Sequence, residues 1–354
     1  MRRAHALFPK ITVGLDVGDK FSVMCEVDAR AEVVRRSSVR TTAAGMESYF
    51  RGRERCRVVL EVGTHSPWLS RQLEALGHEV IVANPSAMYA KGHQRKRNDR
   101  MDAEFLARQG RADPKLLFPM QHRGVQAQQD LAWVRARDQL VRVRTKLINH
   151  VRGAVKSQGG RVGRHSAEAF ARLAAPEIPP LLQPALAPLL ETIAGVTTQI
   201  HAYDRAVEGM IQECYPEAAQ LQQPKGVGPI TALAFVLLVE DAARFECSRD
   251  VGAFFGLVPR LDDSSNDHPQ LRITKAGDEL GRRLLVSAAQ YILGPNGPEC
   301  DLRRFGEAMT QRGGKNAKKR AAVAVARKLA VLLHRLWVSQ GRYDPDYVLR
   351  RRSA

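Results

Sequence analysis

Short apolar runs in the first third of the chain predict β-strands. The runs lie at residues 11–17, 21–27, 31–36, 58–62 and 79–83. A helix candidate at residues 67–76 stands between the last two and is followed by Gly77. Consecutive strands followed by a strand–helix–strand unit with short connections predict a mixed sheet with helices on its faces. We therefore expect residues 1–115 to form an α/β domain.

From about residue 121 the apolar residues recur at spacings of three and four, which predicts long helices. The first stripe is Trp133, Ala136, Leu140, Val143, Leu147 and Ala154. The second is Leu186, Leu190, Ile193, Ile200, Tyr203, Val207, Met210 and Cys214. Gly159-Gly160 and a proline-rich segment interrupt the pattern between them. Residues 116–218 are thus expected to form a helical hairpin or a dimerising coiled coil.

Residues 219–354 are predicted to be a mostly helical C-terminal domain. It opens with Gly226-Val-Gly228 followed by Pro229, a pattern typical of the first residues of a helix. Free backbone N–H groups at such a turn bind anions. The turn is therefore either part of a helix-hairpin-helix element that holds a DNA phosphate or a tight connection between packed helices.

The balance of basic and acidic residues limits the kinds of molecule that suit this chain as binding partners. The 354 residues include 55 Lys and Arg against 37 Asp and Glu, a net charge of +18 with a pI near 10.2. Ten basic residues against two acids fall in residues 121–164, and fourteen against three in residues 302–354. Such an excess favours a polyanionic partner, nucleic acid before a membrane surface. No apolar run of about 18 residues and no signal-peptide pattern is present, so we expect a cytoplasmic protein associated with the bacterial nucleoid.

The five cysteines are scattered and contain no CxxC spacing. This usage is typical of a reduced compartment, and it argues against a disulfide framework and a structural zinc site.

Four carboxylates are candidates for a catalytic metal site. Asp16 lies in an apolar strand, where an acid is costly unless it is paired or binds a metal. Glu61 ends another strand, and Asp99 and Asp102 share one helix face. Acids from two strands and a helix suit two Mg²⁺ ions in phosphodiester chemistry. Lys96, Arg97 and Arg100 beside them suit a phosphate backbone, although acids in a first helical turn are also common on a solvated surface.

Several motifs in order resemble insertion-sequence-110-type transposases with their DEDD signature, over essentially the whole chain. They are Val13–Lys20, Glu61–Thr64, Lys96–Ala103, Ala136–Val141, Arg144–Asn149, Pro224–Gly228, Gly256–Pro259 and Arg272–Asp278. The resemblance implies a RuvC-like first domain with a ribonuclease-H fold. It also implies that Asp16, Glu61, Asp99 and Asp102 bind Mg²⁺, for which Mn²⁺ can substitute.

The same resemblance implies a catalytic serine shortly after Pro259. The matching residue is Ser264, but Ser265 replaces the glycine that follows this serine in the family, so either serine is a candidate nucleophile. Arg272 and Lys275 are candidates to neutralise the phosphate, and His268 is a weak candidate base. A polar loop with no catalytic role is the alternative interpretation of this segment.

Three hypotheses remain. The resemblance implies a DNA recombinase that moves its own insertion sequence through a phosphoserine intermediate, guided by an element-encoded RNA, and that acts as a dimer or tetramer. Its nucleic-acid contacts would include Arg142, Arg144 and Lys146 on the first long helix, with Gly226 and Gly228. A structure-selective junction nuclease would need the four acids alone. A non-catalytic nucleic-acid-binding protein would need neither the acids nor the serine.

Overall fold

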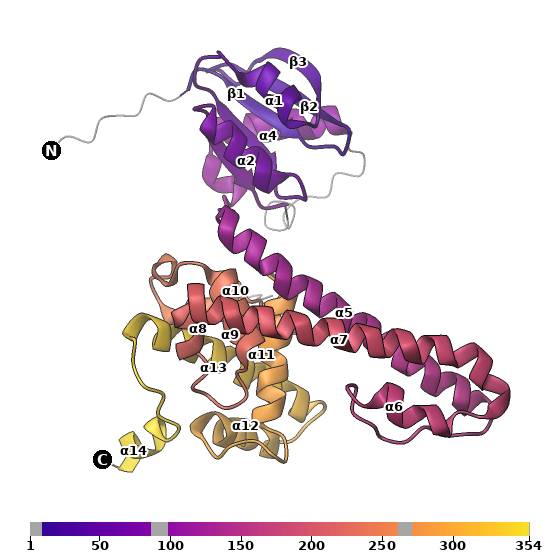
Figure 1. Ribbon diagram of the computed structural model, residues 1–354. Helices are drawn as coiled ribbons and strands as arrows, with labels where there is room; N and C mark the ends of the chain where they lie inside the picture. Colours follow the sequence, from indigo (N-terminus) through magenta and orange to yellow (C-terminus); the bar gives the residue numbers. More distant parts are fainter. Residues whose placement is uncertain (1–8, 86–97, 261–270, 354) are drawn as a thin grey trace. The chain divides into compact units, whose positions relative to one another are not determined.

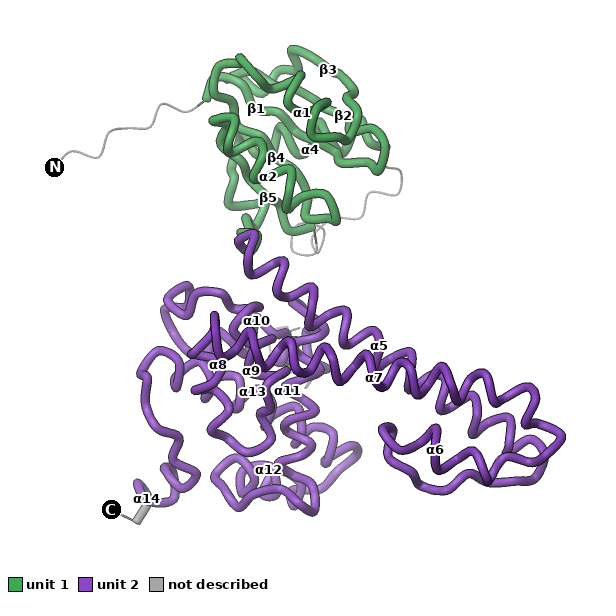
Figure 2. The backbone as a smooth tube through the Cα atoms, in the orientation of Figure 1, with its two compact units in different colours: residues 1–123 green, residues 124–354 purple. Residues whose placement is uncertain are grey.

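The computed structural model describes residues 9–85, 98–260 and 271–353. The chain divides into two compact units, residues 1–123 and 124–354, shown in different colours in Figure 2.

The first unit contains a five-stranded mixed sheet of order β3-β2-β1-β4-β5. Its strands are β1 (Thr12–Asp16), β2 (Phe21–Val27), β3 (Val33–Arg40), β4 (Arg57–Glu61) and β5 (Glu79–Ala83). Strands β1, β2 and β3 pair antiparallel, whereas β1, β4 and β5 run parallel. The mixed sheet expected from the sequence is thereby confirmed, and each expected strand differs from the observed one by a few residues at most.

Helices cover both faces of this sheet (Figure 1). On one face, α1 (Ala43–Phe50) and α2 (Ser66–Ala75) bury Phe50 and Leu69 against Leu15 and Leu60. On the other face, α4 (Asp99–Ala112) buries Leu106 against β4 and β5 and is followed by the 3₁₀ turn η2 (Pro114–Leu117). The alternation of side chains along each strand thus gives the sheet two separate cores.

The second unit is helical. Its helices are α5 (Val125–Ser157), α6 (Phe170–Ala174), α7 (Gln183–Cys214), α8 (Pro216–Gln220), α9 (Pro229–Val239), α10 (Val251–Phe254), α11 (Glu279–Ile292), α12 (Asp301–Gln311), α13 (Ala317–Ser339) and α14 (Tyr347–Ser353). The 3₁₀ turns are η3 (Ala175–Glu177), η4 (Pro180–Leu182), η5 (Ala242–Arg244) and η6 (Ser248–Asp250). Helix α9 is apolar all round, and its last eight residues are buried at the centre of the unit, as expected for such a helix. Within the described residues, no helix combines the length and the apolar character needed to cross a bilayer.

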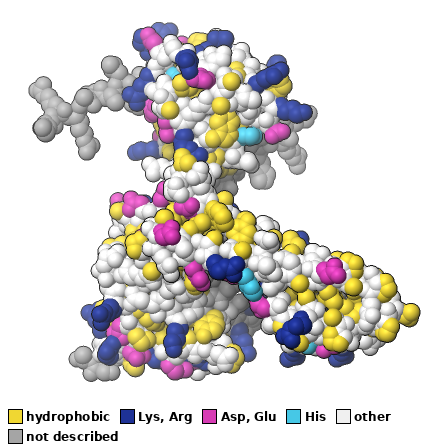
Figure 3. All heavy atoms as spheres, in the orientation of Figure 1, with side chains coloured by type: hydrophobic (Ala, Val, Ile, Leu, Met, Phe, Trp, Pro, Cys, Tyr) yellow, Lys and Arg dark blue, Asp and Glu magenta, His cyan; other side chains and the backbone are white. Residues whose placement is uncertain are grey.

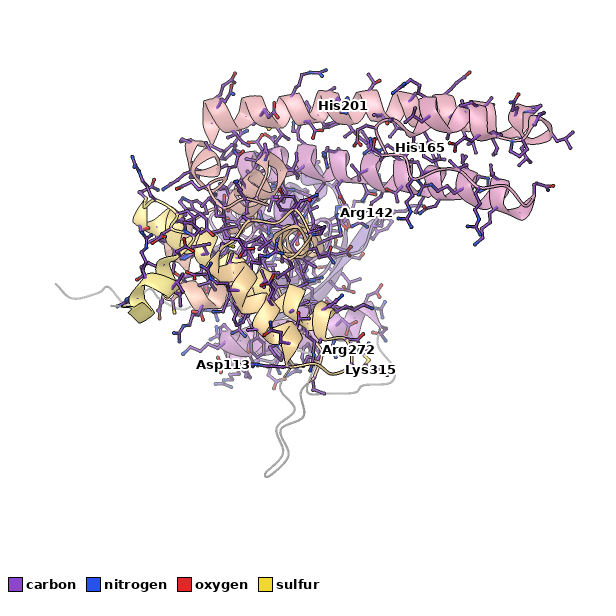
Figure 4. All side chains as sticks on the ribbon, turned by 90° about the horizontal axis from the view of Figure 1, so that it is seen from below. Asp113, Arg142, His165, His201, Arg272 and Lys315 are labelled. Carbon is purple, nitrogen blue, oxygen red and sulfur yellow. The ribbon has the colours of Figure 1, made fainter. Side chains whose placement is uncertain are left out.

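Helices α5 and α7 pack side by side as a hairpin, seen in Figure 4 where Arg142 labels α5 and His201 labels α7. One half of the hairpin shares the core of α9, so this part of the region 116–218 packs with the C-terminal helices. The other half forms a core with α6, and Figure 3 shows further hydrophobic side chains at the surface there.

The stripe predicted for the second long helix is mostly confirmed, whereas that for the first is wrong except at Leu147 and Ala154, which pack against the core shared with α6. Leu186, Ile193, Ile200 and Val207 are buried on α7, whereas Trp133 of α5 is 45% exposed. The buried face of α5 instead runs through Leu131, Val134, Ile148, Val151 and Val155, and it includes Asp130, Asp138 and Arg144. These three polar residues make hydrogen bonds or ion pairs inside the unit, so the buried face could not be found from apolar spacing alone.

Candidate active site and nucleic-acid contacts

The sheet brings Asp16 and Glu61 together. Each is the last residue of its strand, and the residues before them, Leu15 and Leu60, are paired in the parallel β1–β4 ladder. Because side chains alternate along a strand, Asp16 faces the same side as Gly14, and Glu61 the same side as Val59. Both Gly14 and Val59 face α4. The two carboxylates therefore lie at one edge of the sheet, on its α4 face.

Helix α4 brings Asp99 and Asp102 to that edge. A Cβ added at Gly14 would lie 1.9 Å from the carbonyl oxygen of Ala103 and 2.5 Å from the backbone nitrogen of Ala107, so only glycine allows this approach. Asp99 lies one helical turn before Ala103 and shares its face. The Asn98 side chain caps the helix by accepting a hydrogen bond of 2.9 Å from the Met101 N–H, which fixes where the first turn begins.

The other three acids act electrostatically on Asp16. The pKa of Asp16 is raised to about 6 by burial and, in decreasing order, by the negative charges of Asp99, Asp102 and Glu61. A half-buried carboxylate that faces three others favours a bound proton or a cation. Perturbed acids of this kind gather at functional sites.

A pocket of about 360 Å³ adjoins Asp16 and Glu61, and it is also lined by Val17, Asp19 and the segment from Val62 to Ser66. Within it, His65 Nε2 lies 3.6 Å from an Asp19 carboxylate oxygen. The indole N–H of Trp68 donates a hydrogen bond of 3.1 Å to His65 Nδ1, which assigns the proton of the neutral ring to Nε2. No pattern in the sequence marks His65 or Asp19 as site residues, and only the fold places them at the pocket beside Glu61.

The donors suit Mg²⁺ in chemical type. All four are carboxylates, the hard oxygen ligands that Mg²⁺ prefers. Among the described residues, no three His, Cys, Asp or Glu side chains lie close enough together to hold one ion. Mg²⁺ keeps several waters and is commonly bound through one or two carboxylates with substrate phosphates, so the acids fit it without a closed shell.

The basic residues expected to contact nucleic acid are placed very differently from one another. Arg100 is exposed in the first turn of α4, and Lys146 is exposed on α5. Arg142 is partly exposed on α5, where it pairs with Asp138 and Glu279 (Figure 4). Lys96 and Arg97 lie outside the described residues.

Arg144 does not fit its expected role in phosphate binding. Its side chain is 7% exposed, and it donates hydrogen bonds of 3.3 Å to Thr197 of α7 and to Glu168. The guanidinium holds the hairpin together and is not presented to a nucleic-acid backbone.

The glycine turn before α9 is well formed. Gly226 has φ +103°, and an added Cβ would lie 3.0 Å from the ring of Tyr291. Gly228 is exposed and precedes Pro229, the first residue of α9. Helices α8 and α9 flank this turn, so both of its expected roles, anion site and tight connection, stay compatible with the geometry.

The candidate nucleophiles Ser264 and Ser265 lie outside the described residues, as does His268. The residues on either side of that segment are paired, because Pro259 and Ile273 form an antiparallel bridge. The Arg260 N–H donates to the Arg272 carbonyl at 3.0 Å, and the Lys275 N–H to the Gly256 carbonyl at 3.2 Å. Arg272 and Lys275 are therefore exposed where the two ends of the serine segment meet.

Comparison with known proteins agrees with these features. A transposase family model with the DEDD designation matches residues 13–158, and the model described as "Transposase IS116/IS110/IS902 family" matches residues 218–300. The chain belongs to this transposase family. The first match contains all four acids, and the second contains the Gly226 turn and the serine segment.

Individual transposases match most of this chain and most of their own length. This chain is 29% identical to a probable family 20 transposase of Pseudomonas aeruginosa over 342 residues, which are 94% of this chain and 98% of that protein. It is 28% identical to the transposase for insertion sequence element IS1111A of Coxiella burnetii, over 94% of this chain and 90% of that protein. The transposase for insertion sequence element IS1328 of Yersinia enterocolitica is 28% identical over 80% of this chain and 85% of its own.

Proposed function

We propose that this transposase is a DNA recombinase that cuts and rejoins strands of its insertion sequence, with the four acids holding Mg²⁺ and Ser264 acting as nucleophile. The observation that carries the proposal is the half-buried Asp16, whose pKa is raised by burial and by the charges of Asp99, Asp102 and Glu61, in a member of this family. The strand order of the first unit, with its antiparallel and parallel halves, agrees with the RuvC-like, ribonuclease-H type of fold.

The acids act through position and charge. Asp16 and Glu61 are fixed by the sheet, and Asp99 and Asp102 by a capped helix, so their arrangement costs little reorganisation when substrate binds. When bound there, Mg²⁺ supplies Lewis-acid activation of the phosphate and stabilisation of the leaving oxygen. Arg100 stands beside these acids and suits a neighbouring backbone phosphate.

In the proposed reaction, the Ser264 oxygen attacks phosphorus and forms an O–P bond while the bond to the 3′ oxygen breaks. The serine proton goes to a base, and the 3′ oxygen leaves as a hydroxyl after it takes up a proton. Attack by a 3′ hydroxyl of another strand reverses the step and frees the serine, so exchange needs no nucleotide cofactor. Arg272 and Lys275 stand at the ends of the serine segment, where they would neutralise the phosphate.

The proposed partners are a guide RNA, DNA and further copies of this chain. We assign target choice to a structured RNA encoded by the element, because backbone-binding arginines and lysines carry no base information. The turn from Gly226 to Gly228 is assigned to a DNA phosphate in a helix-hairpin-helix element. Exchange of two strands at two sites favours a dimer or a tetramer.

The acid site is tested by strand cleavage. The full-length protein is incubated with DNA that carries the element's ends, the flanking transcript and Mg²⁺, beside Asp16→Asn, Asp102→Asn and Glu74→Gln. Glu74 is an exposed acid of α2 outside the site, so its variant controls for loss of a charge. We expect both aspartate variants to lose cleavage by at least about 100-fold, as for other removed groups of a preorganised site, and Glu74→Gln to keep it. Wild-type rates in the aspartate variants, or cleavage in EDTA, would exclude the metal site.

A junction nuclease that uses the four acids and activated water is the alternative function. It is favoured only by the acid cluster itself, and it predicts cleavage that survives loss of both Ser264 and Ser265.

A further inference from the structure

A second cavity, remote in sequence from the acids, lies in the second unit between α12, α13 and α14. We call it the C-terminal groove; its volume is about 1010 Å³. One wall is a stripe along α13 from Ala324 to Ser339, and the facing wall runs along α12 from Asp301 to Arg312. The stripe on α13 rises about 22 Å, long enough for several nucleotides.

The floor of the groove is apolar and carries aromatic rings. Leu302 and Leu336 are buried at its base, and Phe305, Tyr343 and Tyr347 line it. Tyr347 is 44% exposed. The Lys328 Nζ lies 4.1 Å from the centroid of the Phe305 ring, so a cation already stacks on one of these rings.

The walls carry a strong positive charge. Five exposed arginines line the groove: Arg249, Arg312, Arg327, Arg335 and Arg342. None of them forms an ion pair with a carboxylate of the described residues. The two acids of the groove pair with other arginines, Asp301 with Arg304 and Asp344 with Arg350.

This combination identifies the chemistry of the ligand. Arginines along the walls suit phosphates, and an apolar floor with exposed rings suits the faces of unpaired bases. A duplex presents phosphates but keeps its base faces stacked inside, so it would leave the floor unused. An acidic peptide would use the arginines, but it offers no flat rings to pair with Tyr347 and Phe305.

We propose that the C-terminal groove binds an unpaired DNA strand. The proposal rests on the chain acting on DNA as a transposase, and it is independent of the serine chemistry. Strand cutting at element ends frees such a strand, and the groove would hold it until it is rejoined.

The proposal is tested by binding of the full-length protein to a labelled single-stranded DNA oligonucleotide, followed by fluorescence anisotropy across a salt series. The charge variant is Arg312→Gln with Arg335→Gln. Its control is Arg172→Gln with Arg205→Gln, which removes two exposed arginines of α6 and α7 outside the groove. Because each phosphate contact on a single strand contributes about 0.7 to the salt slope, we expect the groove variant alone to flatten that slope by about 1.4.

The base-stacking part uses a second pair of variants. Tyr347→Leu is expected to weaken single-strand binding about 10-fold, whereas Tyr347→Phe keeps the ring and wild-type affinity. Equal loss for duplex DNA in the groove variants, or loss confined to single-stranded RNA of the same sequence or to an acidic peptide, would overturn the proposal. Unchanged binding in both groove variants would overturn it as well.

Two further measurements do not depend on whether the groove variants fold. Photocrosslinking of an iodouracil-substituted strand to the wild-type protein needs no variant to fold, and crosslinks should map to α12, α13 or α14; crosslinks found only elsewhere contradict the proposal. Asp16→Asn should still bind the single strand. If binding at the groove is found while cleavage does not depend on the acids, only the function proposed above fails.

Discussion

Asp16 is a half-buried carboxylate that faces three other acids, so its ionised form is costly in the folded protein. Its pKa is raised to about 6 from an ordinary value of 3.8, which means that the folded state binds this proton more tightly than the unfolded state. The stability contributed by the proton is fully present below about pH 4 and is lost as the pH rises through about 6.

Replacing Asp16 by asparagine should therefore stabilise the metal-free protein at neutral pH. The expected gain in the free energy of unfolding is about 1–2 kcal/mol near pH 7.5 and close to zero near pH 4, after allowance for partial exposure. Urea unfolding in EDTA at the two pH values measures it. A gain of equal size at both would show that ionisation of Asp16 is not the cause.

Addition of Mg²⁺ should reverse the order of stability. A ligand that binds only the folded state stabilises it by about 2.7 kcal/mol at 100 times its dissociation constant, so wild-type protein and Glu74→Gln should gain stability with Mg²⁺. Asp16→Asn should gain much less. Thermal melts with Mg²⁺ and with EDTA check this, and an equal rise in all three proteins would show that the ion binds elsewhere.

Among single residues, the sequence identifies side chains whose type conflicts with that of their neighbours along the chain. Asp16 and Glu61 stand out because each follows a run of strand residues, and Asp99 and Asp102 because they share a helix face. His65 and Asp19 cannot be found that way, since only the return of β4 beside β1 places them at the same pocket. The phosphate contact predicted for Arg144 is wrong because a basic residue on a long basic helix is usually exposed. This one is buried against Thr197 of another helix.

Among the elements, the packing of α4 on β1 positions the acids. Gly14→Ala would force a Cβ against backbone atoms of Ala103 and Ala107, which cannot rotate away. We expect a loss of about 1–3 kcal/mol in the free energy of unfolding and a loss of cleavage as Asp99 and Asp102 move from Asp16. The matched control is Gly153→Ala on α5, where nothing lies within 4 Å of the added Cβ and helix propensity predicts a gain of about 0.5–1 kcal/mol. Chemical denaturation gives both values, and a neutral Gly14→Ala would contradict the close contact.

Arg144 and Lys146 of α5 offer a second matched pair. Arg144→Ala leaves polar groups of the hairpin unpaired and should destabilise the protein by about 1–3 kcal/mol. Lys146→Ala changes an exposed residue and should leave the melting temperature unchanged while it weakens nucleic-acid binding. Melting curves and a salt-dependent binding assay separate the two; the reverse pattern would restore Arg144 as a phosphate contact.

The elements differ in how far sequence predicts them. Strands of the first unit are found because their alternate or continuous apolar residues are buried on the sheet. Helix α7 is found because its buried face is apolar. The face of α5 is missed because Asp130, which accepts a hydrogen bond from Tyr215, and Asp138, which pairs with Arg283, occupy buried positions. Such pairings join residues that are far apart in the chain, so no local sequence pattern predicts them.

For the whole molecule, the four acids and the serine segment belong to different units, residues 1–123 and 124–354. Recombination through Ser264 therefore requires the two units to act on one phosphate, from one chain or from two. The two family models match one segment in each unit, residues 13–158 and residues 218–300, and the motifs that carry the acids and the serine stand in that order along the chain. The proposed recombination depends on the acids and the serine acting together.

Covalent trapping tests that claim most directly. Full-length protein is incubated with labelled element-end DNA, the flanking transcript and Mg²⁺, and a protein–DNA adduct is sought on a denaturing gel beside Ser264→Ala, Ser265→Ala and Asp102→Ala. The account requires an adduct that is lost in Ser264→Ala and in Asp102→Ala but kept in Ser265→Ala. Cleavage that survives both serine substitutions and still needs Asp102 and Mg²⁺ would contradict it and leave a metal-dependent nuclease.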